Sequence, residues 1–318
     1  MGNRIQRTTL FSILSFLLLG VPLHVHAADS GIRQVSETGI THSLLLTGSA
    51  GTQLINEKSE VVWELKEQTR DGYQLDNGNL LITAANWVRE FKAGTRKTVW
   101  SYKLSEDNAE LSTAIRLENG NTMITELGPK ARLIEVTPDG DIAIDVPLQP
   151  ETDNNHMQTR MARKRANGNY IVPHLFAFQV KEYTPKGEVV RNFKTDLPQF
   201  GGADAHPWPF TAIEMPDGNF HVNLTHSNNV AVYNPEGDVV WSLNNDDVDG
   251  RLADPCGAQR LPNGDAIICS YAQRDAKMPR IFQVTPDKKV TWELFHPTHH
   301  AHEVHIITTN GKPAGGWR

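Results

Sequence analysis

The 318-residue sequence is poor in cysteine and has no excess of basic residues. Its 31 Lys and Arg are outnumbered by 37 Asp and Glu, and the formal net charge is −6. Because no basic stripe is present, we expect no nucleic-acid partner. The two cysteines, Cys256 and Cys269, flank a Pro-Asn-Gly turn, and the sequence has no Cys-pair zinc site. They form either a disulfide, which an oxidising compartment would permit, or two separate buried thiols.

The long hydrophobic run of the chain lies at its N-terminus, from Leu10 to Leu23. It follows Arg4 and Arg7, and small residues suited to cleavage stand near Ala27. This pattern predicts a secretory signal peptide at residues 1–27, and the run is too short for a spanning helix with a stop-transfer pattern. No Cys follows the run, so we expect no lipid anchor. The mature protein is predicted to be exported, periplasmic or secreted, without a transmembrane segment.

Several familiar catalytic motifs are also missing. The sequence has no Gly-x-Ser-x-Gly elbow and no phosphate-binding glycine loop, which removes two common enzyme classes. What it has instead is 24 Gly and 18 Pro beside a hydrophobic content of 39%. This composition favours short strands joined by many turns over long helices.

An Asn-Gly or Asp-Gly dipeptide recurs about every 45 residues in the same setting. It follows a short alternating run such as Ser112-Thr-Ala-Ile-Arg-Leu117 and precedes another such as Asn121-Thr-Met-Ile-Thr125, which indicates a β-hairpin. A third and a fourth strand follow in each repeat. Four short strands per repeat of this length are typical of a β-propeller. The turn glycines are Gly78, Gly120, Gly168, Gly218, Gly264 and Gly311, and the fourth strands carry Trp63, Trp100, Trp241 and Trp292, which we expect between neighbouring blades.

Five complete repeats run from residue 71 to about residue 295. Residues 43–64 supply three further strands without a first one, and residues 303–308 supply a first strand without the others. Together they complete a sixth blade, and this closure removes exposed sheet edges. The sequence therefore predicts an all-β, six-bladed β-propeller at residues 43–311, after a leader at residues 28–42 and before a C-terminal tail at residues 312–318.

The histidines gather at one end of the predicted ring. If the strand before each Asn-Gly is innermost, its start and the loop between the second and third strands open at the same channel mouth. His156, His206 and His299 each stand twelve residues ahead of a turn glycine, and His302 begins the closing strand. The other candidates occupy the same loops or the residues just ahead of inner strands: His174, His226, Trp87, Arg274, Trp208 and Asp254.

This cluster has two kinds of chemistry available. Neutral imidazoles from different blades can ligate a divalent transition metal, for which His156, His206 and His299 are the candidates. The same groups can act as base, acid or nucleophile, for which we name His156, His206 and His302. Arg274 would hold an anionic group through its planar fork. His174, His226, Trp208, Asp254 and Trp87 are the predicted substrate-binding residues.

The repeats resemble those of bacterial arylsulfotransferase-type and quinoprotein-like propellers with repeats of the PQQ type. The resemblance is carried by Leu75-Asp-Asn-Gly-Asn79, Glu135-Val-Thr-Pro-Asp-Gly140 and Tyr233-Asn-Pro-Glu-Gly-Asp-Val-Val-Trp241, and it spans residues 43–311. It implies a propeller fold and, in the arylsulfotransferase case, an exported enzyme that passes a sulfuryl group through a histidine. The histidine cluster is also similar to that of six-bladed propeller lyases with a His-bound metal.

Two functions from different classes follow. The first is an enzyme whose His-rich channel mouth binds a small polar or anionic substrate, for sulfuryl transfer or for metal-assisted lyase or hydrolase chemistry. The second is a non-enzymatic propeller whose loops bind a protein or a glycan. The sequence names neither the substrate nor the metal.

Overall fold

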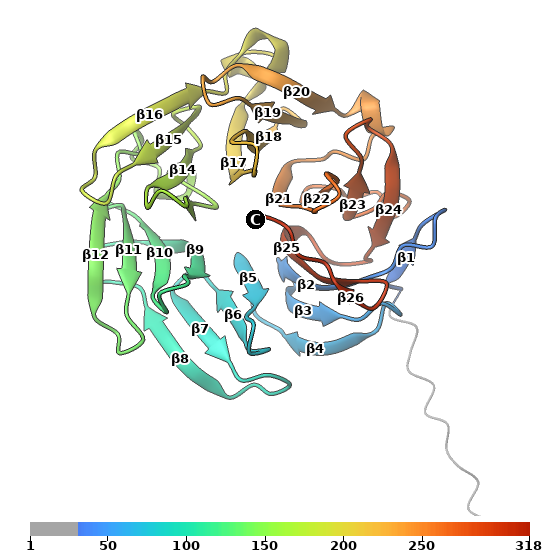
Figure 1. Cartoon of the computed structure of the whole chain (residues 1–318), viewed down its shortest axis with the longest axis horizontal. Helices are drawn as coiled ribbons and strands as arrows, with labels where there is room; N and C mark the ends of the chain where they lie inside the picture. The colour runs from blue at the N-terminus through green and yellow to red at the C-terminus, as the bar shows by residue number, and fades with distance from the viewer. Residues whose placement is uncertain (1–30) are drawn as a thin grey trace, which may run out of the picture. The chain divides into compact units, whose positions relative to one another are not determined.

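Six antiparallel sheets stand around a common centre in the computed structural model, which describes residues 31–318 (Figure 1). The prediction of an all-β, six-bladed propeller is therefore confirmed. The predicted signal peptide, residues 1–27, lies outside the described residues. The strand that precedes each Asn-Gly turn is the one nearest the centre, as Figure 1 shows for β5, β9, β17, β21 and β25.

Each blade is numbered here by its place in the chain. Blade 1 contains β5 (Asp71–Gln74), β6 (Leu80–Thr83), β7 (Trp87–Phe91) and β8 (Thr98–Lys103). Blade 2 contains β9 (Glu110–Arg116), β10 (Thr122–Leu127), β11 (Arg132–Val136) and β12 (Ile142–Pro147). Blade 3 contains β13 (Arg163–Lys164), β14 (Tyr170–His174), β15 (Gln179–Tyr183) and β16 (Val189–Lys194). Blade 4 contains β17 (Pro207–Glu214), β18 (Phe220–His226), β19 (Asn229–Tyr233) and β20 (Val239–Asn244).

The last two blades use both ends of the described chain. Blade 5 contains β21 (Pro255–Arg260), β22 (Ala266–Ser270), β23 (Ile281–Val284) and β24 (Val290–Phe295), with β1 (Arg33–Val35) added outside β24. Blade 6 contains β25 (Ala301–Thr309), β2 (His42–Gly48), β3 (Gly51–Ile55) and β4 (Val61–Leu65), with β26 (Lys312–Pro313) paired to β25.

Helical structure within residues 31–318 is confined to short 3₁₀ turns: η1 (Asn155–Met157), η2 (Pro198–Phe200), η3 (Ala203–Ala205) and η4 (Asp246–Val248). Over the same residues, no helix has the length and apolar character needed to cross a membrane.

The repeated Asn-Gly turns have a common geometry. In blade 1, the Leu75 amide donates to the Asn79 carbonyl at 2.8 Å, and the Asn77 side chain accepts from the Asn79 amide at 2.9 Å. Gly78 closes this turn with φ of +81°, a conformation that glycine adopts without a Cβ clash. The loop is thus three residues long with glycine in the left-handed region. The equivalent glycines of blades 2 to 5 have φ between +83° and +90°.

Tryptophans of the outer strands pack between neighbouring blades, as predicted. Trp63 of β4 lies 5.7 Å from the Phe91 ring of blade 1 and donates to the Thr95 carbonyl at 2.8 Å. Trp292 of β24 is fully buried against His42 of blade 6, with ring centroids 4.6 Å apart. Because each ring contacts two blades, these contacts join the faces of neighbouring blades.

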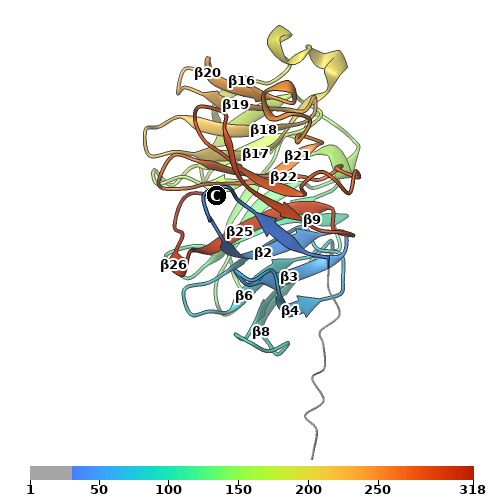
Figure 2. The ribbon, with the colours of Figure 1, turned by 90° about the vertical axis from the view of Figure 1, so that its right-hand side faces the viewer.

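Blade 6 closes the ring with strands from the two ends of the propeller. β25 pairs with β2 from His42 opposite Thr309 to Gly48 opposite Ala301, and Figure 2 shows the two strands side by side. The prediction of one C-terminal and three N-terminal strands is confirmed. The outer boundaries differ from the prediction, because residues 28–42 contain β1 and residues 312–318 contain β26. Both segments add strands to blades.

Cys256 and Cys269 are buried and free, so the alternative of two separate thiols holds. They lie on neighbouring strands beside a register shift between Pro255 and Ala258. Burial raises the pKa of both thiols well above the ordinary value, which keeps them protonated at neutral pH.

Candidate functional site

A cavity of about 230 Å³ lies where the inner strands begin, and we call it the mouth pocket. Its walls come from the starts of inner strands and from loops between second and third strands. In antiparallel blades these two parts lie at the same end of the channel, as the sequence predicts. A larger hollow of about 720 Å³ lies on blade 2 and the loop that follows it, and it contains none of the predicted site residues among those described. The predicted chemistry therefore belongs to the mouth pocket.

Two arginines and one carboxylate form the charged part of the site. Arg70, just ahead of β5, places Nη2 at 2.5 Å from Glu110 Oε2, and His156 Nδ1 lies 3.0 Å from Glu110 Oε1. Arg160 is fully buried with Nη1 at 3.9 Å from Glu110 Oε1, and it donates to the carbonyls of Thr159 and His156. With two guanidinium groups and one carboxylate, this group carries a net positive charge.

The pKa values of Arg160 and Glu110 keep both groups ionised at neutral pH. Burial lowers the pKa of Arg160 to about 10, which leaves it protonated. Burial alone would raise the pKa of Glu110, but hydrogen bonds from His156 and Arg70 outweigh it and lower the pKa to about 2. Arg70 Nη1 is buried and has no hydrogen-bond partner among residues 31–318. A buried guanidinium nitrogen without a partner is costly, and an anion that reached this atom would lower that cost.

His302 supplies a neutral imidazole to the same cavity. Its Nδ1 lies 2.6 Å from the Arg70 carbonyl, which can only accept, so Nδ1 carries the proton and Nε2 carries the lone pair. Burial lowers the pKa of His302 to about 3, so the ring is neutral at physiological pH. Phe210 and Tyr271 meet the ring edge-to-face at 4.9 and 5.8 Å between centroids, which fixes its orientation.

Aromatic rings gather at the rim of the mouth pocket. Trp208 stacks on His206 with centroids 4.9 Å apart and also contacts His226 at 4.5 Å and Phe176 at 5.1 Å. His226 Nδ1 lies 3.3 Å from Asp254 Oδ1, which also accepts from the His226 amide at 3.0 Å.

The backbone of this rim is strained. His206, His226, Asn228 and Asp254 all have φ between +48° and +64°, in the left-handed region that non-glycine residues rarely occupy. The Asn228 side chain accepts from the Asp254 amide at 2.8 Å, which helps to hold this conformation. Strained non-glycine residues concentrate where side chains must be aimed at a ligand.

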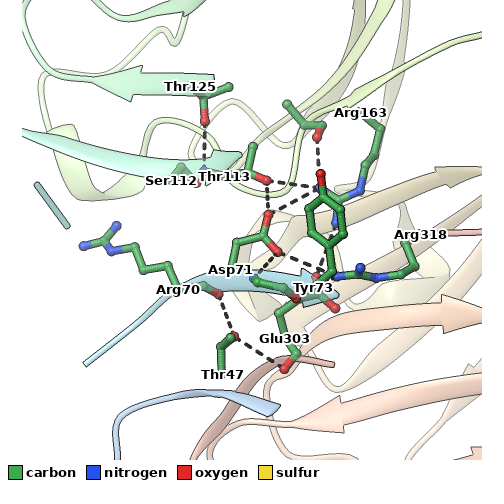
Figure 3. Close-up of polar contacts among 12 residues, drawn as sticks. Thr47, Arg70, Asp71, Tyr73, Ser112, Thr113, Thr125, Arg163, Glu303 and Arg318 are labelled. Carbon is green, nitrogen blue, oxygen red and sulfur yellow. Dashed lines mark hydrogen bonds and ion pairs between the residues drawn. The ribbon is translucent and has the colours of Figure 1, made fainter. Parts of the chain in front are cut away.

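A second charged group contains Asp71, Arg163, Glu303 and Arg318 (Figure 3). Arg163 Nη2 lies 3.5 Å from Glu303 Oε2, and Arg318 Nη2 lies 3.9 Å from Asp71 Oδ1. The Arg318 guanidinium lies over the Tyr73 ring at 5.0 Å. Burial raises the pKa of Glu303 to about 7.

Two dipeptides join this network to the mouth pocket. Arg70 and His302 line the pocket, while the residues that follow them, Asp71 and Glu303, belong to the network. Figure 3 shows the Arg70 side chain directed away from Asp71. The pocket and the network are therefore held by the same two strand starts.

The structure brings half of the predicted site residues together. The mouth pocket is lined by His156, His302, His226, Trp208 and Asp254. His206 is exposed and reaches the rim through its stack on Trp208.

Four predicted residues lie elsewhere, and the prediction is corrected for them. His174 is buried inside blade 3, where it stacks on Tyr183 and shares a hydrogen bond of 3.0 Å with the tyrosine hydroxyl. Trp87 is buried against Phe91 and donates to Glu67 at 2.9 Å. Arg274 is exposed outside the lining of the pocket. His299 is buried with Nε2 at 3.1 Å from the Gly51 carbonyl.

The predicted metal ligands are not brought together. His156 contacts Glu110, His206 stacks on Trp208, and His299 is enclosed near Gly51. Across residues 31–318, no three His, Cys, Asp or Glu side chains form a group that could hold a metal ion. These three histidines have matching positions in the repeats but differ in burial: His206 is exposed, whereas His299 is fully buried.

Sequence reasoning missed two arginines of the pocket lining, Arg70 and Arg160, and the carboxylate that pairs with them, Glu110. Each stands at, or just ahead of, the start of an inner strand, as His302 and Asp254 do. A position at the start of an inner strand could therefore have identified these charged residues, as it identified His302. Phe210 at the start of β17 has the same setting.

The fold and this cavity define a six-bladed β-propeller with a polar pocket at one end of its ring. The chain belongs to the Mal s 1 allergenic protein-like family, whose model matches residues 89–262. No curated protein sequence matches the chain.

Solved structures share the fold at low identity. A protein of unknown function from Bacteroides caccae is 22% identical with a TM-score of 0.73, covering 83% of this chain and 98% of that one. A streptogramin B lyase is 12% identical with a TM-score of 0.57, covering 86% and 90%. A catalytically inactive virginiamycin B lyase from Staphylococcus aureus with quinupristin is 14% identical with a TM-score of 0.56, covering 84% and 88%. The resemblance to arylsulfotransferase-type and quinoprotein-like propellers stays a prediction.

Proposed function

We propose that the protein is an enzyme that binds a small organic anion in the mouth pocket and uses His302 as its general base. The observation that carries the proposal is one cavity lined by both Arg70, whose buried Nη1 has no partner among residues 31–318, and His302, whose Nε2 carries the lone pair. Enzyme sites combine a charged group that positions the substrate with a group that accepts its proton. Export of the mature protein is part of the proposal, on the strength of the N-terminal apolar run.

The anion itself would activate the base. Burial and the positive charges of Arg160 and Arg70 lower the pKa of His302 to about 3. A bound anion offsets those charges and raises the pKa of the imidazole, because an opposite charge favours the protonated form. In an elimination, Nε2 takes a proton from a carbon atom of the substrate. The electron pair of the broken C–H bond forms the double bond, and the leaving group departs from the neighbouring carbon with its own bonding pair. Lyase chemistry of this kind is the form we favour, and hydrolysis would use the same base on water.

Sulfuryl transfer is a second candidate, favoured by the same free Nε2. A neutral imidazole with its lone pair in the cavity is a nucleophile as well as a base. Nε2 would attack the sulfur of an aryl sulfate, the bond from sulfur to the aryl oxygen would break, and the phenolate would leave. The product at His302 would be a sulfo-histidine, which intact-protein mass spectrometry detects. The acid–base route leaves His302 unmodified. The proposal assigns no role to a metal.

Binding and turnover separate the roles of the two residues. Small carboxylates and sulfates are titrated into the protein by calorimetry, and product formation is followed by mass spectrometry. We expect Arg70→Gln to weaken binding by about 10- to 100-fold, the value of a charge-assisted hydrogen bond. We expect His302→Gln to retain binding and to lose turnover.

Arg96→Gln, which removes an exposed arginine on blade 1, is the matched control. Unchanged anion binding in Arg70→Gln would reject the proposal. Binding without turnover in the unaltered protein would instead favour a non-enzymatic propeller that presents its loops to a protein or glycan partner.

A further inference from the structure

We propose that the anion bound in the mouth pocket is an aromatic carboxylate, and that the rings around Trp208 select it. This inference rests on the proposed function, because it names the chemical class of ligand for the same cavity. Three observations carry it: the aromatic walls, the size of the cavity and the number of donors without a partner.

The first observation is a set of rigid aromatic walls. Trp208, Phe210 and Tyr271 line the cavity that Arg70 and His302 also line. Phe210 and Tyr271 are held edge-to-face against His302, and Trp208 is held among His206, His226 and Phe176. Rings that are already ordered lose little freedom when a ligand binds, and they favour a flat aromatic partner over an aliphatic one.

The second observation is the size of the cavity. Its volume is about 230 Å³. A water molecule occupies about 30 Å³ of liquid, so the cavity holds about eight groups of that size. A single six-membered ring with one acidic group fits this volume, and a macrocycle does not fit inside it.

The third observation concerns charge and hydrogen bonding. The charged lining residues are Arg70, Arg160 and Asp254, which together carry one positive unit, and Glu110 pairs with Arg70 from outside the lining. A monoanion is the ligand charge that this lining can neutralise. Arg70 Nη1 and Trp208 Nε1 are buried donors on lining residues, and neither has a partner among residues 31–318. A carboxylate offers two oxygens to two donors, whereas a sulfate presents three and would need more.

The test compares ligands that share a carboxylate and differ in the ring. Benzoate and cyclohexanecarboxylate are titrated into the full chain, with affinities taken from NMR chemical shifts. We expect benzoate to bind about two- to tenfold more tightly, which is the value of one aromatic pair. We expect Trp208→Leu to bring the two affinities together, and Trp208→Phe to keep the difference between them.

The outcomes separate this inference from the proposed function. Equal affinities for both carboxylates would overturn the aromatic preference and leave anion binding intact. Tighter binding of phenyl sulfate than of benzoate would overturn the choice of carboxylate. Failure of every anion to bind would overturn the proposed function itself. If Trp208→Leu does not fold, Tyr271→Leu gives the same comparison on another wall of the cavity.

Discussion

Glu303 shows how much a residue depends on its surroundings in this ring. It is fully buried, with Arg163 as its ion-pair partner and the amide of Val304 donating to Oε1 at 2.9 Å. Asp71 lies in the same network and opposes its ionisation. Burial outweighs the nearby arginines and raises its pKa to about 7 from 4.5.

This shift makes stability depend on pH in a definite direction. Between pH 4.5 and pH 7, Glu303 is protonated in the folded state and ionised in the unfolded state, so the folded state binds more protons. The contribution of Glu303 to the free energy of unfolding therefore falls as pH rises through this window, by up to about 3 kcal/mol. Buried histidines whose pKa is lowered, such as His302, contribute with the opposite sign below pH 6.5. We expect Glu303→Gln to remove this contribution, so the difference in free energy of unfolding between the variant and the unaltered protein should change by this amount between pH 5 and pH 8, as measured by urea unfolding.

The exposed Glu236→Gln is the control, and it should keep the slope of the unaltered protein. Parallel pH profiles for Glu303→Gln and the unaltered protein would show that Glu303 is ionised throughout the window.

At the scale of the element, β21 is shaped by its contact with β25. Its register against β22 shifts between Pro255 and Ala258, and Gly257 stands in that interval. A Cβ on Gly257 would lie 2.5 Å from Glu303 Oε1 and 2.6 Å from Glu303 Cα. The absence of a side chain at this position is what lets the two inner strands approach.

We expect Gly257→Ala to lower the free energy of unfolding by about 1–3 kcal/mol, because the backbone of β25 must move. It should also weaken anion binding, since Cys256 and His302 line the mouth pocket on these two strands. Thermal unfolding and calorimetry measure the two effects. In Gly94→Ala the new Cβ meets nothing within 4 Å, so only the strain of φ +66° remains, at about 1 kcal/mol. Equal losses in both variants would argue against the close contact.

At the scale of the molecule, stability depends on closing the ring. β25 contributes Ala301, Val304 and Ile306 to the core and pairs along the length of β2. Without β25, the hydrogen-bonding edge of β2 and the apolar faces of blades 5 and 6 would be open. The strand also brings His302 to the mouth pocket, so closure and site assembly are one event.

We expect a chain that ends at residue 298 to be unfolded or aggregated, because it lacks β25. A chain that ends at residue 311 keeps β25 and loses Arg318, so it should fold with a lower melting temperature. Circular dichroism and size-exclusion chromatography distinguish the two. A folded monomer that ends at residue 298 would refute the role of β25 in closure.

The blades were predictable because their signals are local. The turn at Gly78 needs a left-handed glycine, and the alternating runs on either side of it define the hairpin within a few residues. Repetition of this pattern set the number of blades, and the unmatched strand at residues 303–308 indicated the closure. The shared end of inner strands likewise pointed to His156 and His302.

The site itself was decided by contacts between distant segments. Arg70 meets Glu110 across blades 1 and 2, and His302 donates to the Arg70 carbonyl only after the ring has closed. His299 has the same repeat position as His156, and His174 ends the second strand of its blade, as His226 does. Neighbouring strands bury His174 and His299, which therefore serve in packing. Turn chemistry and alternation act over a few residues and are written in the sequence. Burial, charge pairing and pKa depend on neighbours that only the closed ring supplies.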